Sequence, residues 1–296
     1  MLRDAGQMKP YYVKLIAGLR DIGMPVETVV HDRLTTLDTV EQTPGVHIAD
    51  HGNLRHPRLL NTGVAYVYPF WNLDPWGIRA ESSIGAKVFD PGQVDATVAA
   101  EFTTRLRKRL VAARISRYPQ PENRVDVPMG CLAVFLQSEA HREVGETCYL
   151  SMRKMLSALC ARDDDRAIVI KPHPRDHDPK THAYLARLAA RDSRVQVMDA
   201  NLHDILAQAS VAVTINSAVG IEAHLHRVPV VLCGKSDFHH AAVTVKMPSE
   251  MEAAIASAGD TNWPHDAFLH WYFAEQCLNA GKPSLVADFL TKVSAA

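Results

Sequence analysis

The clearest indication of the fold is the stretch VAVTINSAVGIEAHLHRVPVVLCG, residues 211–234. Two short apolar runs, Val211–Ile215 and Val228–Cys233, flank a segment of helical character at Ala218–His226. Continuous apolar runs of this length are typical of strands that are buried on both faces of a parallel sheet. The stretch therefore predicts a strand–helix–strand unit, with Gly234 ending the second strand.

The same alternation extends upstream of this unit. Apolar runs predict strands at Gly130–Leu136, Ala167–Ile170 and Val195–Met198. Apolar residues at helical spacing predict helices at Glu146–Ala161, Pro179–Ala190 and Leu202–Gln208. Strands that alternate with helices in this way indicate βαβ units, and right-handed crossovers then give a doubly wound α/β domain.

The first half of the chain is less regular. We expect helices at Tyr11–Gly23 and Asp95–Ser116, and strands at Val26–His31, Gly45–Ala49 and Gly63–Tyr68. A Rossmann-like domain normally opens with a buried strand, whereas this chain opens on a helix. We therefore expect the first domain to lack its first strand, and truncation, a wrong start site and loss in this lineage all stay open as reasons.

The segment Arg117–Arg124 carries two prolines among polar residues, which is typical of a linker. It divides the chain into an N-terminal domain over residues 1–120 and a C-terminal domain over residues 121–262. The remaining segment, residues 263–296, is predicted to be helical and to pack across both domains.

Composition excludes several classes of protein. The chain has 296 residues, 32 Lys and Arg against 33 Asp and Glu, and a formal net charge of −1, whereas dedicated nucleic-acid binders usually have a strongly basic face. The mean hydropathy is −0.10, and no apolar stretch reaches the roughly 18 residues that a membrane span needs. The first residues lack an apolar signal core. We therefore expect a cytoplasmic protein that does not bind nucleic acid.

The five cysteines and fifteen histidines do not form a metal-binding pattern. The cysteines are odd in number and contain no CxxC pair, so we expect buried, reduced thiols. No HExxH motif is present either. The sequence thus requires no metal and no other cofactor.

Two loops carry the groups that suggest chemistry, and both follow predicted strands. Ligands of open parallel sheets bind beyond the carboxyl ends of the strands. The first loop is Lys171-Pro172-His173-Pro174-Arg175, in which two prolines stiffen the backbone around an imidazole and two cations flank it. This arrangement suits a phosphate group, although a proline-stiffened turn with solvated charges is the plainer alternative.

The second loop, Thr214–Gly220, links a strand to a helix. Ser217 is a natural N-cap there, and the backbone N–H groups and dipole of the following helix favour an anion. Glu222 lies just inside that helix, where its carboxylate can accept hydrogen bonds from a ribose. An ordinary cap and a solvated helix face remain the alternatives. The residues of this region that we expect to contact a nucleotide are Asn216, Ser217, Gly220, Glu222, Gly234 and Ser236.

These residues resemble a known family. The stretch TINSAVGIEAHLHRVPVVLCGKSDF, residues 214–238, together with Lys171–Pro174, resembles the capsule polysaccharide biosynthesis family, which includes retaining β-Kdo transferases. The matching features are a Lys-Pro-His-Pro-like motif, a Thr-x-x-Ser-x-x-Gly-x-Glu-Ala motif and a Gly-x-x-x-Phe turn. Weaker similarities are Ser116–Pro121, on the hinge side, and Asp74–Arg79 in the first domain.

The resemblance implies a GT-B-like fold, with two Rossmann-like domains facing a cleft. It implies a nucleotide-sugar donor, CMP-Kdo or a related CMP-ulosonate, bound by the C-terminal domain, with His173, Pro174 and Ser217 at the phosphate. The acceptor, a glycan or glycolipid, would lie against the N-terminal domain. A non-catalytic nucleotide-binding protein of capsule assembly and a GT-B polyol-phosphate transferase are the alternatives.

Sugar transfer passes through an oxocarbenium-like state and needs a carboxylate near the anomeric carbon. Asp50 is the first choice, because the family has a Glu-Asp-Gly-Phe motif at this place in the order of motifs. The sequence departs from that motif, since Ala49 replaces the glutamate and His51 precedes the glycine. Asp74, between two tryptophans, is the competing catalytic carboxylate.

Residues 105–117 contain six basic residues at Arg105, Arg107, Lys108, Arg109, Arg114 and Arg117, interleaved with apolar ones. A basic amphipathic helix favours contact with an anionic membrane surface, and a solvated helix face is the alternative. The family's capsule chains are assembled on lipid, so the resemblance implies peripheral contact with the inner membrane through this segment.

Overall fold

The structure is a computed structural model that describes residues 8–29, 32, 34–137 and 147–295. The chain forms two compact units, one made of Met1–Lys87 and Tyr272–Ala296 and the other of Val88–Trp271. This division differs from the predicted boundary near residue 120. It also divides the predicted C-terminal segment 263–296 at residue 271, because the last helix packs in the core of the first unit.

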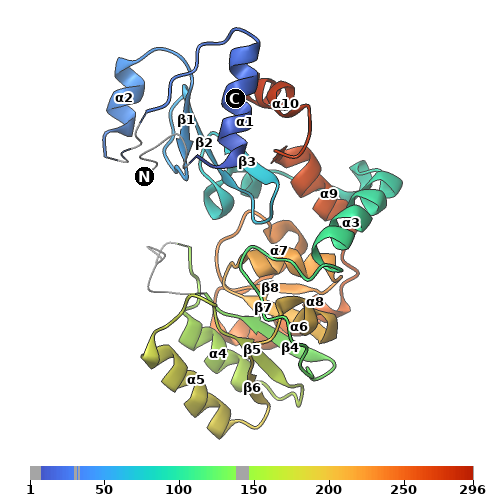
Figure 1. The fold of residues 1–296 in the computed structure, drawn as a ribbon. Helices are drawn as coiled ribbons and strands as arrows, with labels where there is room; N and C mark the ends of the chain where they lie inside the picture. The colour runs from blue at the N-terminus through green and yellow to red at the C-terminus, as the bar shows by residue number, and fades with distance from the viewer. Residues whose placement is uncertain (1–7, 30–31, 33, 138–146, 296) are drawn as a thin grey trace. The chain divides into compact units, whose positions relative to one another are not determined.

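The second unit is built around a six-stranded parallel sheet of order β6-β5-β4-β7-β8-β9 (Figure 1). Numbered within this unit, the order is 3-2-1-4-5-6, as in the Rossmann fold. Its strands are β4 (Cys131–Phe135), β5 (Ile168–Lys171), β6 (Val195–Val197), β7 (Ala209–Thr214), β8 (Val230–Leu232) and β9 (Val243–Thr244). Its helices are α3 (Ala96–Leu110), α4 (Met152–Cys160), α5 (Pro179–Arg191), α6 (Leu202–Gln208), α7 (Ala218–Leu225), α8 (Met251–Asp260) and α9 (His265–His270).

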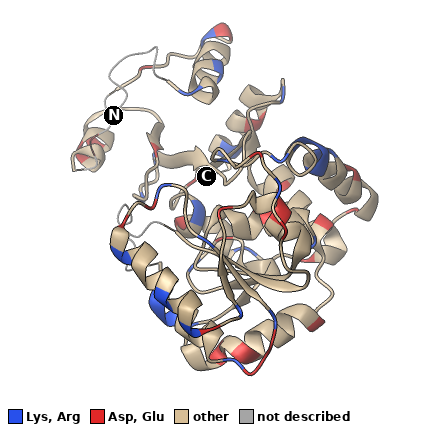
Figure 2. Ribbon diagram, turned by 60° about the horizontal axis from the view of Figure 1, so that its bottom comes forward, with Lys and Arg blue, Asp and Glu red and all other residues tan. Residues whose placement is uncertain are grey.

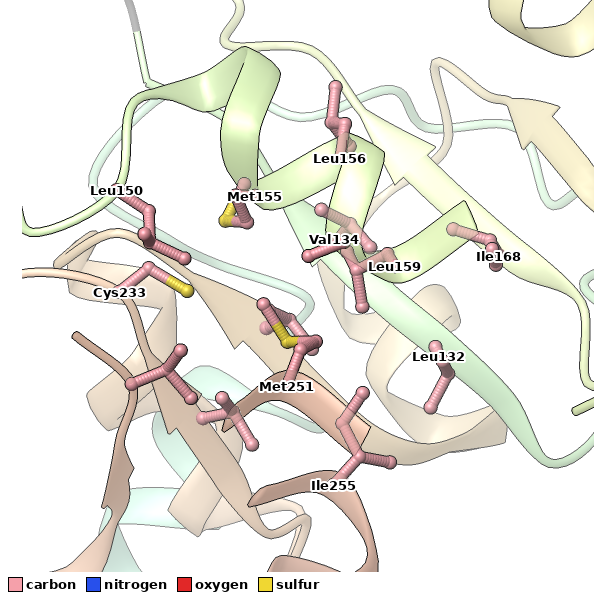
Figure 3. Packing of buried hydrophobic residues seen from close by; sticks show 14 of the residues in the cluster. Leu132, Val134, Leu150, Met155, Leu156, Leu159, Ile168, Cys233, Met251 and Ile255 are labelled. Atoms are coloured by element: carbon pink, nitrogen blue, oxygen red, sulfur yellow. The ribbon is translucent and has the colours of Figure 1, made fainter. Parts of the chain in front are cut away.

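Helices cover both faces of this sheet (Figure 1). On one face, α4, α5 and α8 pack against alternate residues of the central strands. Helices α6 and α7 also contact β7. Figure 3 shows Met155, Leu159 and Met251 of the helices gathered against Leu132 and Val134 of β4. The central strands β4 and β5 are buried along their whole length, which explains why their sequences are continuous apolar runs.

Most predicted elements of the second unit are confirmed, with shifted ends. The helix predicted at Glu146–Ala161 begins only at Met152, where Ser151 caps it, and part of the prediction lies outside the described residues. The helix predicted at Asp95–Ser116 ends at Leu110, and Asp95 is its N-cap, as expected. The two-residue strand β9 was not predicted.

The first unit contains a smaller, mixed sheet of order β1-β2-β3-β10. Its strands are β1 (His47–Asp50), β2 (Leu59–Val64), β3 (Phe70–Asp74) and β10 (Leu278–Asn279), and its helices are α1 (Pro10–Asp21), α2 (Thr36–Gln42) and α10 (Leu285–Ser294). Only β1 and β2 are parallel, since β3 is antiparallel to both of its neighbours. Tyr11 of α1 stacks on Trp71 of β3 with ring centroids 4.1 Å apart, so Trp71 is a core residue.

The sheet of the first unit differs from the prediction in two places. Residues 26–29 form no strand, and the rest of the predicted strand Val26–His31 lies outside the described residues. The strand predicted at Gly63–Tyr68 ends at Val64, and the chain turns before β3 begins at Phe70. Strand β3 was not predicted, because it contains the polar residues Asn72 and Asp74. Both are buried and form hydrogen bonds inside the unit.

Shorter turns complete the chain. Turns of 3-10 helix lie at Arg79–Glu81, Ser83–Ala86, Pro91–Gln93, His239–Ala241 and Pro248–Glu250, and a π-helical turn lies at Trp271–Gln276. None of the helices in the described part of the chain combines the length and the apolar character that crossing a membrane requires.

Candidate functional site

The register of the second sheet brings the two predicted loops together. Phe135, the last residue of β4, is paired with Lys171 at the end of β5 on one side and with Thr214 at the end of β7 on the other. The strand order reverses at β4, so the loops that follow β5 and β7 diverge from the same point. This is the position at which open α/β sheets bind ligands.

The loop after β5 holds His173 against an aromatic neighbour. The ring of Tyr118 meets that of His173 edge-on, with centroids 5.1 Å apart, and the Arg175 guanidinium lies 4.8 Å from the Tyr118 centroid. The backbone N–H of Arg175 donates to His173 Nδ1 at 3.1 Å, which leaves Nε2 as the ring nitrogen directed away from the loop backbone. Lys171 is different, because its buried side chain donates to Asp199 at 3.2 Å.

The loop after β7 is fixed by side-chain hydrogen bonds. Gln137, just beyond β4, donates to Asn216 Oδ1 at 3.1 Å, and Asn216 Nδ2 donates to the Lys235 carbonyl at 2.8 Å. Ser217 caps α7, since its Oγ accepts from the Val219 N–H at 3.3 Å. Asn216 therefore ties the loops after β4, β7 and β8 to one another, and Ser217 stands at the N-terminus of an eight-residue helix.

Glu222 is the most unusual group in this region. Its side chain is 1% exposed, and Oε1 has no hydrogen-bond partner among the described residues. Burial raises the pKa of Glu222 to about 7, although a hydrogen bond with Ser116 and the charge of Arg117 oppose that shift. Ser116, Arg117 and Tyr118 thus bring the hinge-side segment of the resemblance to the same place as the two loops.

Three of the predicted contacts have structural explanations. A Cβ on Gly220 would come within 3.0 Å of the Phe238 ring, so this glycine lets α7 approach that buried side chain. A Cβ on Gly234 would come within 2.6 Å of the Thr147 carbonyl oxygen, so Gly234 allows the chain at residue 147 to lie close. Ser236 Oγ accepts from the Phe238 N–H at 3.3 Å within its own turn.

Asp50, at the end of β1 in the first unit, sits in a polar cluster. Lys9 Nζ lies 3.0 Å from both carboxylate oxygens, His51 Nδ1 lies 3.0 Å from one of them, and the Tyr12 hydroxyl donates to the other. Burial raises the pKa of Asp50, but the hydrogen bonds from His51, Tyr12 and Lys9 outweigh it and hold that pKa well below its usual value. Asp50 is therefore ionised and about one-third exposed.

Asp74, the competing carboxylate, is engaged by the backbone of its own loop. Its oxygens accept from the N–H groups of Trp76 at 2.8 Å, Gly77 at 3.2 Å and Ser83 at 2.9 Å, and from the Ser83 hydroxyl at 2.7 Å. The side chain is buried. Asp74 therefore organises the turn after β3, and of the two carboxylates Asp50 is the one that can reach a ligand.

The basic segment 105–117 is only partly a free cationic face. Figure 2 shows basic residues distributed over several helices of the chain. Within the segment, Arg114 pairs with Asp204 at 2.6 Å and Arg105 with Glu101 at 3.5 Å. Leu106 and Leu110 point into the core rather than outward. The segment is thus a helix face with an apolar side that the second unit already covers.

Several of the many histidines pair with each other inside the second unit. His224 Nδ1 lies 2.8 Å from His265 Nδ1, and His203 Nδ1 lies 2.9 Å from His226 Nε2. Burial lowers the pKa of His265 to about 4 and that of His226 to about 3, so these rings are neutral. In the described ranges no group of three or more His, Cys, Asp or Glu side chains could hold a metal ion.

Sequence reasoning missed Lys9, Tyr12 and Gln137. The first two lie 41 and 38 residues from Asp50, and no local pattern links a helix start to a strand end at that separation. Gln137 directly follows the predicted strand Gly130–Leu136. Its position after a strand end could have indicated a site residue.

The region that contains this geometry matches a known protein family. Residues 134–279, which include both loops and Glu222, match the family model described as capsule polysaccharide biosynthesis protein. This segment belongs to the capsule polysaccharide biosynthesis family. The predicted resemblance is therefore confirmed over the region in which its motifs were strongest. A comparison with curated protein sequences finds no significant match.

Several solved structures are similar to this chain. The KpsC β-Kdo 2,7 transferase of Thermosulfurimonas dismutans is 15% identical with a TM-score of 0.52, over 89% of this chain and 96% of that one. The KpsC β-Kdo 2,4 transferase of the same organism is 17% identical with a TM-score of 0.45, over 72% and 78% of the two chains. The first likeness confirms the predicted GT-B-like α/β fold class.

A third solved structure is the UDP-GlcNAc 2-epimerase of Methanocaldococcus jannaschii, in complex with UDP-GlcNAc and UDP. It is 12% identical with a TM-score of 0.39, over 73% of this chain and 54% of that one.

Proposed function

We propose that this chain is a glycosyltransferase of surface or capsular polysaccharide biosynthesis, with a CMP-linked ulosonate such as CMP-Kdo as donor. The observation that carries the proposal is the convergence of the family's motifs at the strand-order reversal of the second unit. His173 follows β5, whereas Ser217 and Glu222 belong to the N-terminal part of α7, which follows β7. The ends of β5 and β7 lie on either side of β4, where a nucleotide would bind. The family match and the shared fold with a Kdo transferase support it.

In this proposal each group has a task that suits its surroundings. The His173 imidazole and the N-terminus of α7 at Ser217 stabilise the phosphate, where negative charge grows as the donor bond breaks. The unpartnered oxygen of Glu222 accepts a hydrogen bond from a ribose hydroxyl, which would satisfy a buried polar atom. Lys171 supports the loop through Asp199 rather than touching the phosphate.

Asp50 supplies the carboxylate of the transfer step. The bond between the anomeric carbon and the phosphate oxygen breaks and releases CMP, while the oxygen of an acceptor hydroxyl forms the new glycosidic bond and its proton passes to the departing phosphate. Because Asp50 is ionised and its pKa is lowered, it is suited to act as a nucleophile or to stabilise positive charge at the anomeric carbon, and not as an acid. No metal ion takes part in this scheme.

Nucleotide binding without catalysis is the second candidate function. One observation favours it: the Asp50 carboxylate is already engaged by Lys9, Tyr12 and His51. Hydrolysis or transfer of the donor by the purified protein separates the two functions. Transfer of a polyol phosphate from a CMP-linked donor is a third, and analysis of the product would identify it.

The acceptor and the location of the reaction are also proposals. We infer that the acceptor is a glycan or glycolipid at the inner membrane. Basic residues of α3, Lys108 among them, would provide peripheral contact with anionic lipid.

The proposed function is tested by transfer from CMP-Kdo with the variants His173→Ala and His177→Ala. His177 is a matched control, because it is exposed in the same loop and does not face Tyr118. Loss of a group that stabilises the departing phosphate should lower kcat about 100-fold in His173→Ala. His177→Ala should keep the wild-type rate, and equal rates for both variants would contradict the site.

A further inference from the structure

A pocket lies in the first unit, apart from the site residues described above. It has a volume of about 300 Å³, at the lower end of the usual range for small-molecule sites. Its lining residues are Arg55, His56, Pro57, Leu59, Leu60, Pro75 and Trp76. The two leucines are buried and form the apolar part of the lining, while Trp76 is 37% exposed.

Arg55 and Trp76 form the polar and aromatic part of this pocket. The Arg55 guanidinium carbon lies 4.4 Å from the centroid of the Trp76 ring. Among the described residues, none makes a hydrogen bond or ion pair with the Arg55 side chain, and the indole N–H of Trp76 is likewise without a partner there. Stacking keeps the guanidinium planar beside the ring and leaves its N–H groups available to an anion.

Both walls of the pocket are held by buried polar residues of the sheet. On the Trp76 side, Asp74 accepts from the Trp76 N–H at 2.8 Å. On the Arg55 side, Asn61 Nδ2 donates to the Leu54 carbonyl at 2.8 Å. These hydrogen bonds fix the backbone on both sides of the pocket. Asp74 therefore has a structural task, which is to position Trp76.

The chemistry of the pocket selects one class of ligand. An exposed indole beside an apolar wall favours the C–H face of a sugar ring, and a guanidinium fork matches a carboxylate. His56 is already engaged, because its Nε2 lies 3.0 Å from Glu41 and its Nδ1 accepts from the Arg58 N–H. A single unpaired cation fits a carboxylate of charge −1 better than a phosphate dianion.

We propose that the Arg55–Trp76 pocket binds one carboxylated sugar residue of the acceptor glycan. This inference rests on the proposed function for its biological meaning, but the binding can be measured without any transfer. The carboxylate is held by Arg55, and the ring lies against Trp76 and the apolar lining.

The test compares two probes that differ only in the carboxylate, methyl β-glucuronide and methyl β-glucoside, by ligand-observed NMR titration of the full chain. A charge-assisted hydrogen bond should make Kd for the glucuronide about tenfold lower than for the glucoside. Arg55→Gln should abolish that preference. Arg153→Gln is the matched control, because Arg153 stacks on Tyr184 at 4.7 Å but lies outside the pocket.

Trp76→Leu should weaken both probes, and Arg55→Gln keeps the test valid if the tryptophan variant does not fold, since Arg55 is exposed. Equal affinity for the two probes, or an unchanged preference in Arg55→Gln, would overturn the inference. So would competition by inorganic phosphate at the same concentration as glucuronide.

A CMP titration of the same samples separates this inference from the proposed function. CMP binding without a glucuronide preference would reject the pocket alone. A glucuronide preference without CMP binding would reject the proposed donor site and leave the pocket.

Discussion

Asp50 ends β1 and Asp74 ends β3 of the same sheet, but their surroundings give them different tasks. Asp50 is partly exposed and held by side chains, whereas Asp74 is buried and held by four N–H and O–H groups of its own loop. The sequence left both as candidates because Asp50 matches the place of the family's Glu-Asp-Gly-Phe motif and Asp74 lies between two tryptophans. Hydrogen bonding separates them: a carboxylate that is saturated by backbone donors supports structure.

The matched variants Asp50→Asn and Asp74→Asn test this difference. We expect Asp50→Asn to lower turnover of the donor by more than about 100-fold with a small change in melting temperature, because partly exposed ion pairs contribute about 0–1 kcal/mol. Asp74→Asn should destabilise the protein by about 2–3 kcal/mol, since charge-assisted bonds to a buried group are lost. Thermal denaturation and steady-state kinetics of both variants decide the assignment, and the reverse pattern would refute it.

Glu222 makes a pH-dependent contribution to stability. Its pKa is raised from 4.5 in the unfolded chain to about 7 in the folded protein. The folded state therefore holds the proton more tightly, and the stability that this adds is complete below pH 4.5 and is lost as the pH rises through 7. Loss of the proton leaves a buried charge with little compensation.

Glu222→Gln should remove this dependence. In urea denaturation, we expect the variant to gain stability relative to the wild type between pH 5 and pH 8, by up to about 3 kcal/mol. Glu252→Gln is the control, because Glu252 is exposed on α8. A stability difference between Glu222→Gln and wild type that is the same at both pH values would contradict a raised pKa.

At the scale of elements, the sequence predicted the strands that are buried along most of their length, because such strands consist of continuous apolar runs. Strands β4, β5 and β7 lie in the buried centre of the six-stranded sheet and consist mainly of apolar residues, so they could be predicted. The helix Leu202–Gln208 was predicted with its observed ends. The two-residue strands β9 and β10 carry too few residues for any pattern. Strand β3 was missed because buried asparagine and aspartate resemble loop residues until their partners are known.

The site was predictable only where it is local in sequence. His173 and Ser217 were found because each follows a strand end directly, and the register of Phe135 with Lys171 and Thr214 brings those two loops together. The cluster around Asp50 was not predictable, since Lys9 and Tyr12 reach it from α1 through tertiary packing. Gly220 and Gly234 belong to the motif, yet close packing accounts for them.

The packing of α4 on the six-stranded sheet yields a prediction at this scale. Met155 is fully buried in the core shown in Figure 3, whereas Met129 is 87% exposed. Met155→Ala should destabilise the protein by about 2–5 kcal/mol because it removes apolar contacts and leaves a cavity. Met129→Ala should change stability by less than about 0.5 kcal/mol. Similar denaturant midpoints for the two variants would contradict the packing of α4.

At the scale of the whole molecule, the proposed tasks are divided between the two units. The unit Val88–Trp271 contains the motifs of the capsule polysaccharide biosynthesis family, and the first unit contains Asp50 and the Arg55–Trp76 pocket. A near-neutral chain with a net charge of −1 is consistent with local anion sites rather than a broad basic surface. The proposed function therefore requires first that the second unit binds a nucleotide, and that this nucleotide is CMP.

Thermal denaturation of the full chain with CMP, UMP and GMP tests this most directly. A ligand that binds only the folded state stabilises it by about 2.7 kcal/mol at a concentration 100-fold above Kd, which is a shift of several degrees for a protein of this size. We predict that CMP raises the melting temperature more than UMP or GMP, and that the double variant His173→Ala, Ser217→Ala loses most of that shift. A larger shift with UMP or GMP would contradict the CMP-linked donor, and no shift with any nucleotide would contradict the site itself.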